Sequence, residues 1–595
     1  MPALVIVDMV GLQRLRRSSI AGCCPEKGQQ LAEGMDTRAK TRFFVERFSG
    51  ALLWSTFVEQ SATKMQGFVS GGGFYSPQRH DNWFASLFGA ETSCVMRRFE
   101  HANMGTTVLT NWKGLTLHKL ILLWMACLSA FTSAAATAAV EEDVRSLVEG
   151  HVTRGVELAD RIWALAEVGY QEQESSRLLR ETLAQAGFRI ETGIADIPTA
   201  FVATYGSRGP VIGILAEFDA LPGLSQAAVP VRQPRVPSAA GHACGHHLFG
   251  AASVTAALAL ADWLKQTDTD AQIRLYGTPA EEGGSGKVYI ARSGAFEGVD
   301  VVLHWHPGSV NGASPSTTTA NKSGRFTFTG KPAHAASAPD KGRSALDGVE
   351  AMNFMVNLMR EHVPQTSRIH YVITDGGDAP NIVPEQAQVY YYVRHPKADM
   401  VVELFERVVN AAQAAAQGTE TSVHVEVMHG NYPVMPSHTL AKVVDENMRA
   451  LGGISYTEEE TAFARDLRAT LKAPSHEIGS QQTIQPFQFR QTMGSTDVGD
   501  VSWLVPTVGF NTATWVPGTP AHSWQAVAAG GMSIGHKGMK LAAHVLAQTA
   551  VDLIEKPKIV SAAWQELRES RGEDFVYSAL LGDREPPLDY RRKPQ

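Results

Sequence analysis

Residues 209–223 read GPVIGILAEFDALPG, an uninterrupted apolar run that ends in two acids and a turn. An apolar run without polar alternation is typical of a strand that is buried on both faces of a sheet. Glu217 and Asp219 follow the strand directly, and open parallel sheets place their ligand sites at the carboxyl ends of their strands. Taken alone, two acids in a loop are more often solvated charges, so this stretch indicates the fold more firmly than the site.

Helical and strand patterns alternate on both sides of this stretch. Residues 141–169 and 250–266 carry apolar side chains at helical spacing, whereas residues 272–282 and 299–308 read as strands that run into loops. This alternation predicts an α/β fold, with a mostly parallel sheet and helices on both of its faces.

The order of the predicted strands and helices changes between residues 321 and 432. The order there is strand, helix, strand, strand, helix, strand, which is the order of a ferredoxin-like unit. The first pattern resumes after Pro433. We therefore predict a discontinuous main domain over 141–320 and 433–595, with an α+β domain inserted over 321–432.

Residues 104–140 have the shape of a secretory signal peptide, with a positive flank, an apolar run over Leu120–Phe131 and a tail of small residues. Met104 stands where such a peptide would start, so residues 1–103 are unassigned and are interpreted as a mis-called extension. If Met1 is the true start, residues 120–140 are instead a membrane anchor. Either interpretation predicts an exported body, which is periplasmic or secreted if the segment is a signal peptide and membrane-anchored if the apolar segment is retained.

Composition narrows the class of function. The chain has 595 residues and a net charge of −7, which argues against binding of nucleic acid through a basic surface and favours small-molecule chemistry. Four of the five cysteines lie in the first quarter of the chain, so no disulfide framework is expected in the body. Cys244 stands apart from them, in the histidine-rich stretch GHACGHHLFG at residues 241–250.

Several metal-binding residue types follow successive strands. Cys244 and His246 alternate, so both point to one side if the backbone there is extended, and thiolate and imidazole are good ligands for zinc-like ions. Glu281 and Glu282 are adjacent in a Gly-rich turn, where one carboxylate can bind metal while the other acts as a general base. Each residue has a structural explanation by itself, but together they predict a metal site. The other candidates are His304, His306 and His522.

A cysteine hydrolase is the rival interpretation, with Cys244 as nucleophile and His246 as its base. The spacing counts against it, because a side chain two positions away in an extended loop flanks the thiol rather than facing it. The paired glutamates also have no task in that scheme.

The motifs DALP (219–222), HACGH (242–246) and PAEE (279–282), with a late histidine at His522, resemble the metal-dependent amidohydrolase and peptidase family of aminoacylases and hippurate hydrolase. The resemblance covers roughly residues 145–555. It implies one or two divalent ions, Zn or Mn, Glu281 as general base, and Asp219 orienting the metal-binding histidine. The metal ligands that it implies are Cys244, His246, Glu282, His306 and His522.

Two positions depart from the family pattern. His247 stands where relatives often have Asp or Asn, which leaves the supporting contact at this position open. His304 and His306 both fit the fourth cluster, and we favour His306 as the ligand.

The inserted segment GKPAHAAS (330–337) resembles the region in which a histidine reaches into a neighbouring subunit's site, and this gives His334 the oxyanion-stabilising role. Asn381 and Arg394 are then candidates for binding the substrate carboxylate. The resemblance implies hydrolysis of the amide bond of N-acyl or N-aroyl amino acids, aminobenzoyl-glutamate-like compounds among them, by a homodimer. The alternatives are a subunit that needs a heterologous partner in a heterodimer, and a dipeptidase acting on small peptides.

Overall fold

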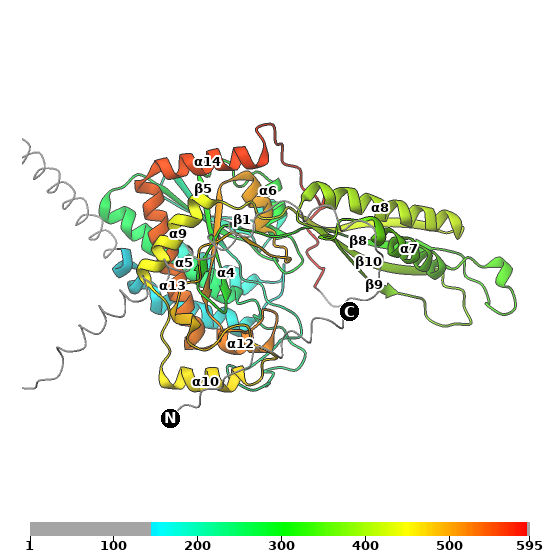
Figure 1. The fold of residues 1–595 in the computed structure, drawn as a ribbon, viewed down its shortest axis with the longest axis horizontal. Helices are drawn as coiled ribbons and strands as arrows, with labels where there is room; N and C mark the ends of the chain where they lie inside the picture. The colour runs from blue at the N-terminus through cyan, green and yellow to red at the C-terminus, as the bar shows by residue number, and fades with distance from the viewer. Residues whose placement is uncertain (1–143, 592–595) are drawn as a thin grey trace, which may run out of the picture. The chain divides into compact units, whose positions relative to one another are not determined.

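The computed structural model describes residues 144–591 (Figure 1). The predictions for residues 1–103 and 104–140, an extension followed by a signal peptide or anchor, lie outside the described residues. Among the described helices, α5 (His246–Thr267) is long and apolar enough to cross a membrane, but 94% of its apolar window is buried inside the protein. Its apolar character is therefore that of a core helix.

The larger sheet has seven strands in the order β1-β2-β4-β3-β5-β13-β6. Strand β3 pairs in parallel with β4 and with β5, and β13 pairs in parallel with β5, so the four central strands share one direction. The outer strands β1, β2 and β6 pair antiparallel. The bounds are β1 (Arg189–Thr192), β2 (Phe201–Tyr205), β3 (Val211–Ala216), β4 (Gln272–Gly277), β5 (Val301–Gly308), β6 (Gly312–Ala313) and β13 (Thr507–Ala513).

The helices of the main domain bury this sheet. Helix α5 packs against α13 and against strands β3, β4 and β5, while α6 packs against α11. A further helix covers residues 144–165. The named helices are α4 (Gln173–Gln185), α5, α6 (Gly286–Arg292), α9 (His438–Leu451), α10 (Glu458–Arg468), α11 (Val498–Leu504), α12 (Trp524–Gly530), α13 (Ser533–Glu555) and α14 (Pro557–Arg571), with short 3-10 turns η3 (Ile194–Asp196) and η6 (Ser480–Gln482).

The smaller sheet is antiparallel, with four strands in the order β11-β8-β10-β9, and helices α7 and α8 pack on it (Figure 1). Its core is separate from that of the main domain, because alternate residues of β8 and β10, such as Phe326, Phe328 and Tyr391, point toward the two helices. The elements are β8 (Ala320–Thr329), η4 (Pro339–Lys341), α7 (Ala345–Met359), η5 (Arg360–His362), β9 (Arg368–Asp375), β10 (Gln386–His395), α8 (Ala398–Gly418) and β11 (Ser422–Asn431).

The architecture confirms the predicted fold class, a largely parallel α/β domain with a ferredoxin-like insertion. Because β3, β4, β5 and β13 run in one direction, their carboxyl ends meet at one edge of the sheet. The loops that leave this edge carry the acids after β3 and after β4, and β5 carries His304 and His306. A two-stranded parallel ribbon, β7 (Ser316–Thr317) with β12 (Arg490–Gln491), lies outside both sheets.

Candidate metal centre

The backbone between Cys244 and His246 is not extended, so the condition under which strand alternation would point both side chains to one side is not met. Gly245 has φ 81° and ψ 17°, and α5 begins at the next residue. A Cβ atom at Gly245 would lie 2.7 Å from the Cβ of Pro307. Only glycine fits this left-handed, crowded position, so the sharp turn and not strand alternation brings the thiol and the imidazole together.

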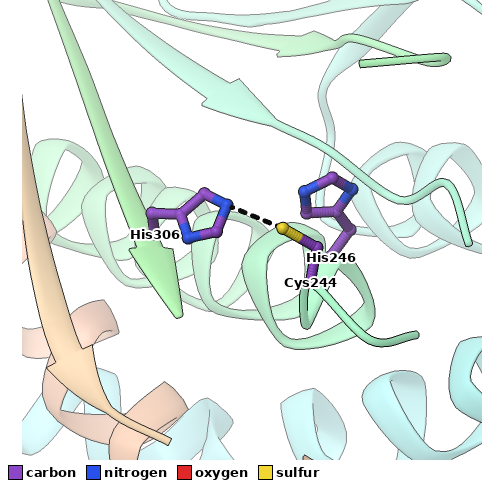
Figure 2. Close-up of side chains that lie close together, drawn as sticks. All are labelled: Cys244, His246 and His306. Atoms are coloured by element: carbon purple, nitrogen blue, oxygen red, sulfur yellow. Dashed lines mark hydrogen bonds between the residues drawn. The ribbon is translucent and has the colours of Figure 1, made fainter. Parts of the chain in front are cut away.

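Cys244, His246 and His306 form one compact donor group (Figure 2). The Sγ of Cys244 lies 3.4 Å from Nε2 of His306, and the rings of the two histidines meet edge-on with centroids 5.6 Å apart. Nδ1 of His306 contacts the carbonyl oxygen of Pro307 at 2.8 Å, which leaves Nε2 to face the thiol. This is the way in which a protein fixes the tautomer of a histidine ligand.

A second donor group consists of Cys244, Glu282 and His522, so the two groups share one sulfur. Oε1 of Glu282 lies 3.1 Å from Nε2 of His522, yet this buried oxygen has no hydrogen-bond partner. The backbone N–H of His522 donates to the carbonyl oxygen of Ala243 at 2.9 Å and holds the histidine beside the thiol. Two sets of N, O and S donors that meet at a common sulfur fit a pair of divalent ions.

Asp219 contacts the imidazole of His246 and the backbone of Glu282. Its Oδ1 lies 2.9 Å from Nδ1 of His246, and its Oδ2 accepts a hydrogen bond of 2.9 Å from the backbone N–H of Glu282. Burial would raise the pKa of Asp219, but the neighbouring His246 and the hydrogen bonds lower it below its ordinary value. Nε2 of His246 is buried and lies 3.0 Å from Oε2 of Glu217, and neither of these two atoms makes a hydrogen bond.

Glu281 lies beside the donor groups and belongs to a third set with Glu217 and His246. Burial, together with the charges of Glu217 and Glu282, raises the pKa of Glu281 well above its ordinary value. Glu282, by contrast, lies against His522. The adjacent glutamates therefore have different surroundings, as a base and a ligand require.

Sequence reasoning missed a buried ion network under the centre. Nζ of Lys287 lies 2.7 Å from Oε1 of Glu217 and 2.7 Å from Oδ1 of Asp497, and none of the three side chains is more than 1% exposed. The other oxygen of Glu217, Oε2, lies 3.0 Å from Nε2 of His246. In the sequence, Lys287 follows the Gly-rich residues 283–286, which are typical of a surface turn, and nothing local indicates that this lysine is buried.

The two remaining histidines of the 241–250 stretch support the loop. Nε2 of His242 contacts the carbonyl oxygen of Ile162 at 3.1 Å, and Nε2 of His247 contacts that of Gly530 at 3.0 Å. Burial lowers the pKa of His242 to about 3, which keeps this ring neutral. At this position, where the chain departs from the family pattern, the partner of His247 is therefore the backbone carbonyl of Gly530.

His304 lies on β5 two residues before His306, so both side chains point to the same face of the strand. None of the donor groups in the described residues includes His304. Burial lowers the pKa of His304 to about 4. Its imidazole packs so closely on Gly509 that a Cβ there would lie 2.3 Å from the ring. The geometry thus places His306, rather than His304, among the donors.

Three predicted residues lie in the inserted domain, and no contact found in residues 144–591 joins them to the donor groups. Nδ1 of His334 accepts hydrogen bonds of 3.2 Å from the backbone N–H groups of Ala336 and Ser337, and its side chain is exposed. The carbonyl oxygen of Asn381 accepts from the backbone N–H of Ala335, so Asn381 lies next to the His334 segment. Arg394, on β10, lies over the ring of Tyr392.

Comparison with known proteins identifies the family. A peptidase dimerisation domain matches residues 318–420. The chain is 37% identical over 446 residues to one of the subunits of p-aminobenzoyl-glutamate hydrolase of Escherichia coli, a match that covers 70% of this chain and 93% of that protein. The chain belongs to the M20 family of peptidases and amidohydrolases. The predicted family and fold are thereby confirmed.

Other M20 relatives agree with this assignment. Xaa-Arg dipeptidase of Mus musculus is 31% identical over 427 residues, which cover 69% of this chain and 88% of that protein. The solved structure of a candidate aminohydrolase from methicillin resistant Staphylococcus aureus superimposes with a TM-score of 0.53 at 16% identity, over 70% of this chain and 100% of that one, and shows the same fold. The protein is thus a metal-dependent amide hydrolase of the M20 type with a dimerisation domain.

Proposed function

We propose that this M20 protein hydrolyses the amide bond of N-acyl or N-aroyl amino acids, with p-aminobenzoyl-glutamate-like compounds as substrates. The observation that carries the proposal is the pair of donor groups that share the sulfur of Cys244 beside the carboxylate of Glu281. The name of the Escherichia coli relative supports the substrate class.

The proposed metal ligands are Cys244, His246 and His306 for one ion, and Cys244, Glu282 and His522 for the other. Bound divalent ions acidify water and polarise the substrate carbonyl. Glu281 takes a proton from the attacking water and returns it to the leaving amine, and its raised pKa suits both transfers. Asp219 holds the ring of His246 through Nδ1, so that Nε2 faces the centre.

The ions are proposed to be zinc or manganese. A mixed set of sulfur, nitrogen and oxygen donors suits zinc and accepts other first-row ions. Metal analysis of the purified protein, followed by removal and stepwise return of each ion, identifies the metal that restores turnover.

A homodimer is proposed to complete the site, with His334, Asn381 and Arg394 supplied by the partner's inserted domain. The dimerisation domain leaves large apolar side chains exposed on α7 and on the edge strand β9, and exposed apolar side chains beside an unpaired strand edge favour a surface for another protein. The exposed residues are Phe354, Met355, Leu358, Tyr371, Val372 and Ile373.

Mixing two inactive variants tests this arrangement. Glu281→Gln and His334→Ala should each be inactive alone, and a mixture of the two should regain activity, because a mixed dimer contains one intact site. A mixture that stays inactive, together with a wild-type protein that is an inactive monomer by mass in solution, would favour the alternative, a chain that needs a heterologous partner. A second component of the same Escherichia coli hydrolase, 27% identical to this chain over 278 residues, is the relative that suggests it.

The main test is a hydrolysis screen of N-acyl amino acids and dipeptides with each metal. Glu281→Gln should abolish turnover while the bound metal is unchanged, and retained turnover would remove Glu281 from the mechanism. A dipeptidase is the second candidate function, because Xaa-Arg dipeptidases are 30–31% identical to this chain. Export through residues 104–140 is also proposed, and N-terminal sequencing of the mature protein tests it.

A further inference from the structure

A pocket of about 230 Å³ shares His306 with the first donor group and has no role in the mechanism above. His306 belongs to both: its Nε2 faces Cys244, and its ring lines the pocket together with His304. The walls are mainly apolar, with Met435 and Phe510 among them, and hydroxyl groups such as that of Thr496 are interspersed. A substrate held at the donor groups therefore has an adjacent space for one of its substituents.

Arg490 lines this pocket from the ribbon β12. Its backbone N–H donates to the carbonyl oxygen of Pro315 at 3.0 Å, and its pairing with Ser316 fixes the backbone. The Nε atom of the guanidinium is buried and has no hydrogen-bond partner, and no ion pair to this side chain is found within residues 144–591. Nε of Arg360 and of Arg591 is also buried without a hydrogen-bond partner, but Arg490 in addition lines the pocket, where a ligand can supply the acceptor.

The chemistry of the pocket selects the missing acceptor. A guanidinium pairs best with a carboxylate or phosphate, whose two oxygens match its planar fork. Apolar walls beside such a group suit a short aliphatic chain that ends in a carboxylate. In an aminobenzoyl-glutamate-like substrate this is the side chain of the amino acid half, since the aroyl half has no anionic group.

We propose that Arg490 and its pocket form the subsite that binds the acidic side chain of the amino acid in the substrate. This inference rests on the proposed function and deepens it, because Asn381 and Arg394 are assigned to the other carboxylate, the one on the α-carbon. A cation at this position also disfavours an arginine side chain, so the subsite separates N-acyl glutamates from Xaa-Arg dipeptides.

The test compares isosteric substrates. The wild-type enzyme should prefer p-aminobenzoyl-glutamate over p-aminobenzoyl-glutamine by about 10- to 100-fold in kcat/KM, the range expected for one charged hydrogen bond. Arg490→Met should reduce this ratio to near one by raising KM for the glutamate compound, and Arg490→Lys should keep part of it. Arg208→Met is the matched control, because Arg208 is exposed and pairs with Asp270 instead.

A second substrate pair separates the two carboxylates. Amidation of the α-carboxylate should weaken turnover to the same degree in wild type and Arg490→Met. If Arg490→Met keeps the preference for glutamate over glutamine, or if the wild type has none, the subsite is wrong, while hydrolysis of both compounds leaves the proposed function standing.

Calorimetric titration of the same compounds into Glu281→Gln protein, with and without Arg490→Met, measures binding without turnover. Tighter binding of the glutamate compound that disappears in the double variant supports the subsite, even if the wild type cleaves neither compound and the proposed function fails. Equal binding of the glutamate and glutamine compounds overturns the subsite.

Discussion

Replacement of Lys287 by Met tests whether the buried ion network holds the metal centre. The methionine has a similar volume but leaves Glu217 and Asp497 facing each other without a cation. Both carboxylates lie 2.7 Å from Nζ of Lys287, and all three groups are fully or almost fully buried. Burial would lower the pKa of Lys287, but the two carboxylates raise it above its ordinary value, so the ammonium is charged in the folded state.

Removal of one partner from a buried ion pair costs about 3–5 kcal/mol, because a charge is left uncompensated. For a chain of this size, that loss corresponds to a decrease of roughly 3–5 °C in the midpoint of thermal unfolding. Glu217 also contacts His246, so Lys287→Met should weaken metal binding as well. Thermal unfolding followed by tryptophan fluorescence and metal content per chain are the two measurements.

Two controls distinguish the effect of an uncompensated buried charge from the effect of losing any lysine. Lys265→Met changes an exposed lysine in the last turn of α5 and should leave the midpoint almost unchanged. The triple variant Lys287→Met, Glu217→Gln, Asp497→Asn removes all three charges and should recover most of the lost stability, since neutral replacement of a buried ion set is often tolerated. If Lys287→Met costs less than about 1 kcal/mol, the value typical of exposed pairs, the reasoning about burial is refuted.

Three further predictions follow from the same contacts. Cys244→Ala removes the sulfur common to both donor groups, so metal analysis should find both ions lost, and retention of one ion would show that the sulfur is not shared. Gly245→Ala places a Cβ 2.7 Å from Pro307 at a residue with φ 81°, so metal titration should show at least a tenfold loss of affinity. Gly150→Ala is the control, because nothing lies within 4 Å of the added atom, and it should bind metal with the wild-type affinity. Burial lowers the pKa of His429 to about 4, so the stability conferred by this neutral ring is present above pH 6.5 and is lost, by about 3 kcal/mol, as the pH falls toward 4. In denaturant unfolding, His429→Gln should lose less stability than the wild type over that pH range. An equal loss in both proteins would contradict the lowered pKa of His429.

Local patterns in the sequence were enough to predict the two kinds of domain and most of the donor residues. The run at 211–216 forms a strand because six apolar residues without alternation suit burial on both faces, and the strand is indeed buried along its whole length. The pairs at 217–219, 244–246 and 281–282 could be found because each set is contiguous in the chain. Parallel strands then bring their carboxyl ends to one edge whatever loops connect them.

Tertiary structure alone decided which atoms meet. Cys244 and His246 converge through a left-handed glycine that is packed on Pro307, a contact more than sixty residues away in the chain that no local pattern encodes. Lysine and arginine are usually surface residues, yet Lys287 is completely buried between two acids. Arg490 lines the pocket because β12 pairs with β7, which lies more than 170 residues earlier in the chain. The sequence by itself determined the fold class and the chemistry of the donors, because these depend on local periodicity and residue type. The roles of Lys287 and Arg490 depend on long-range packing, which only the folded chain establishes.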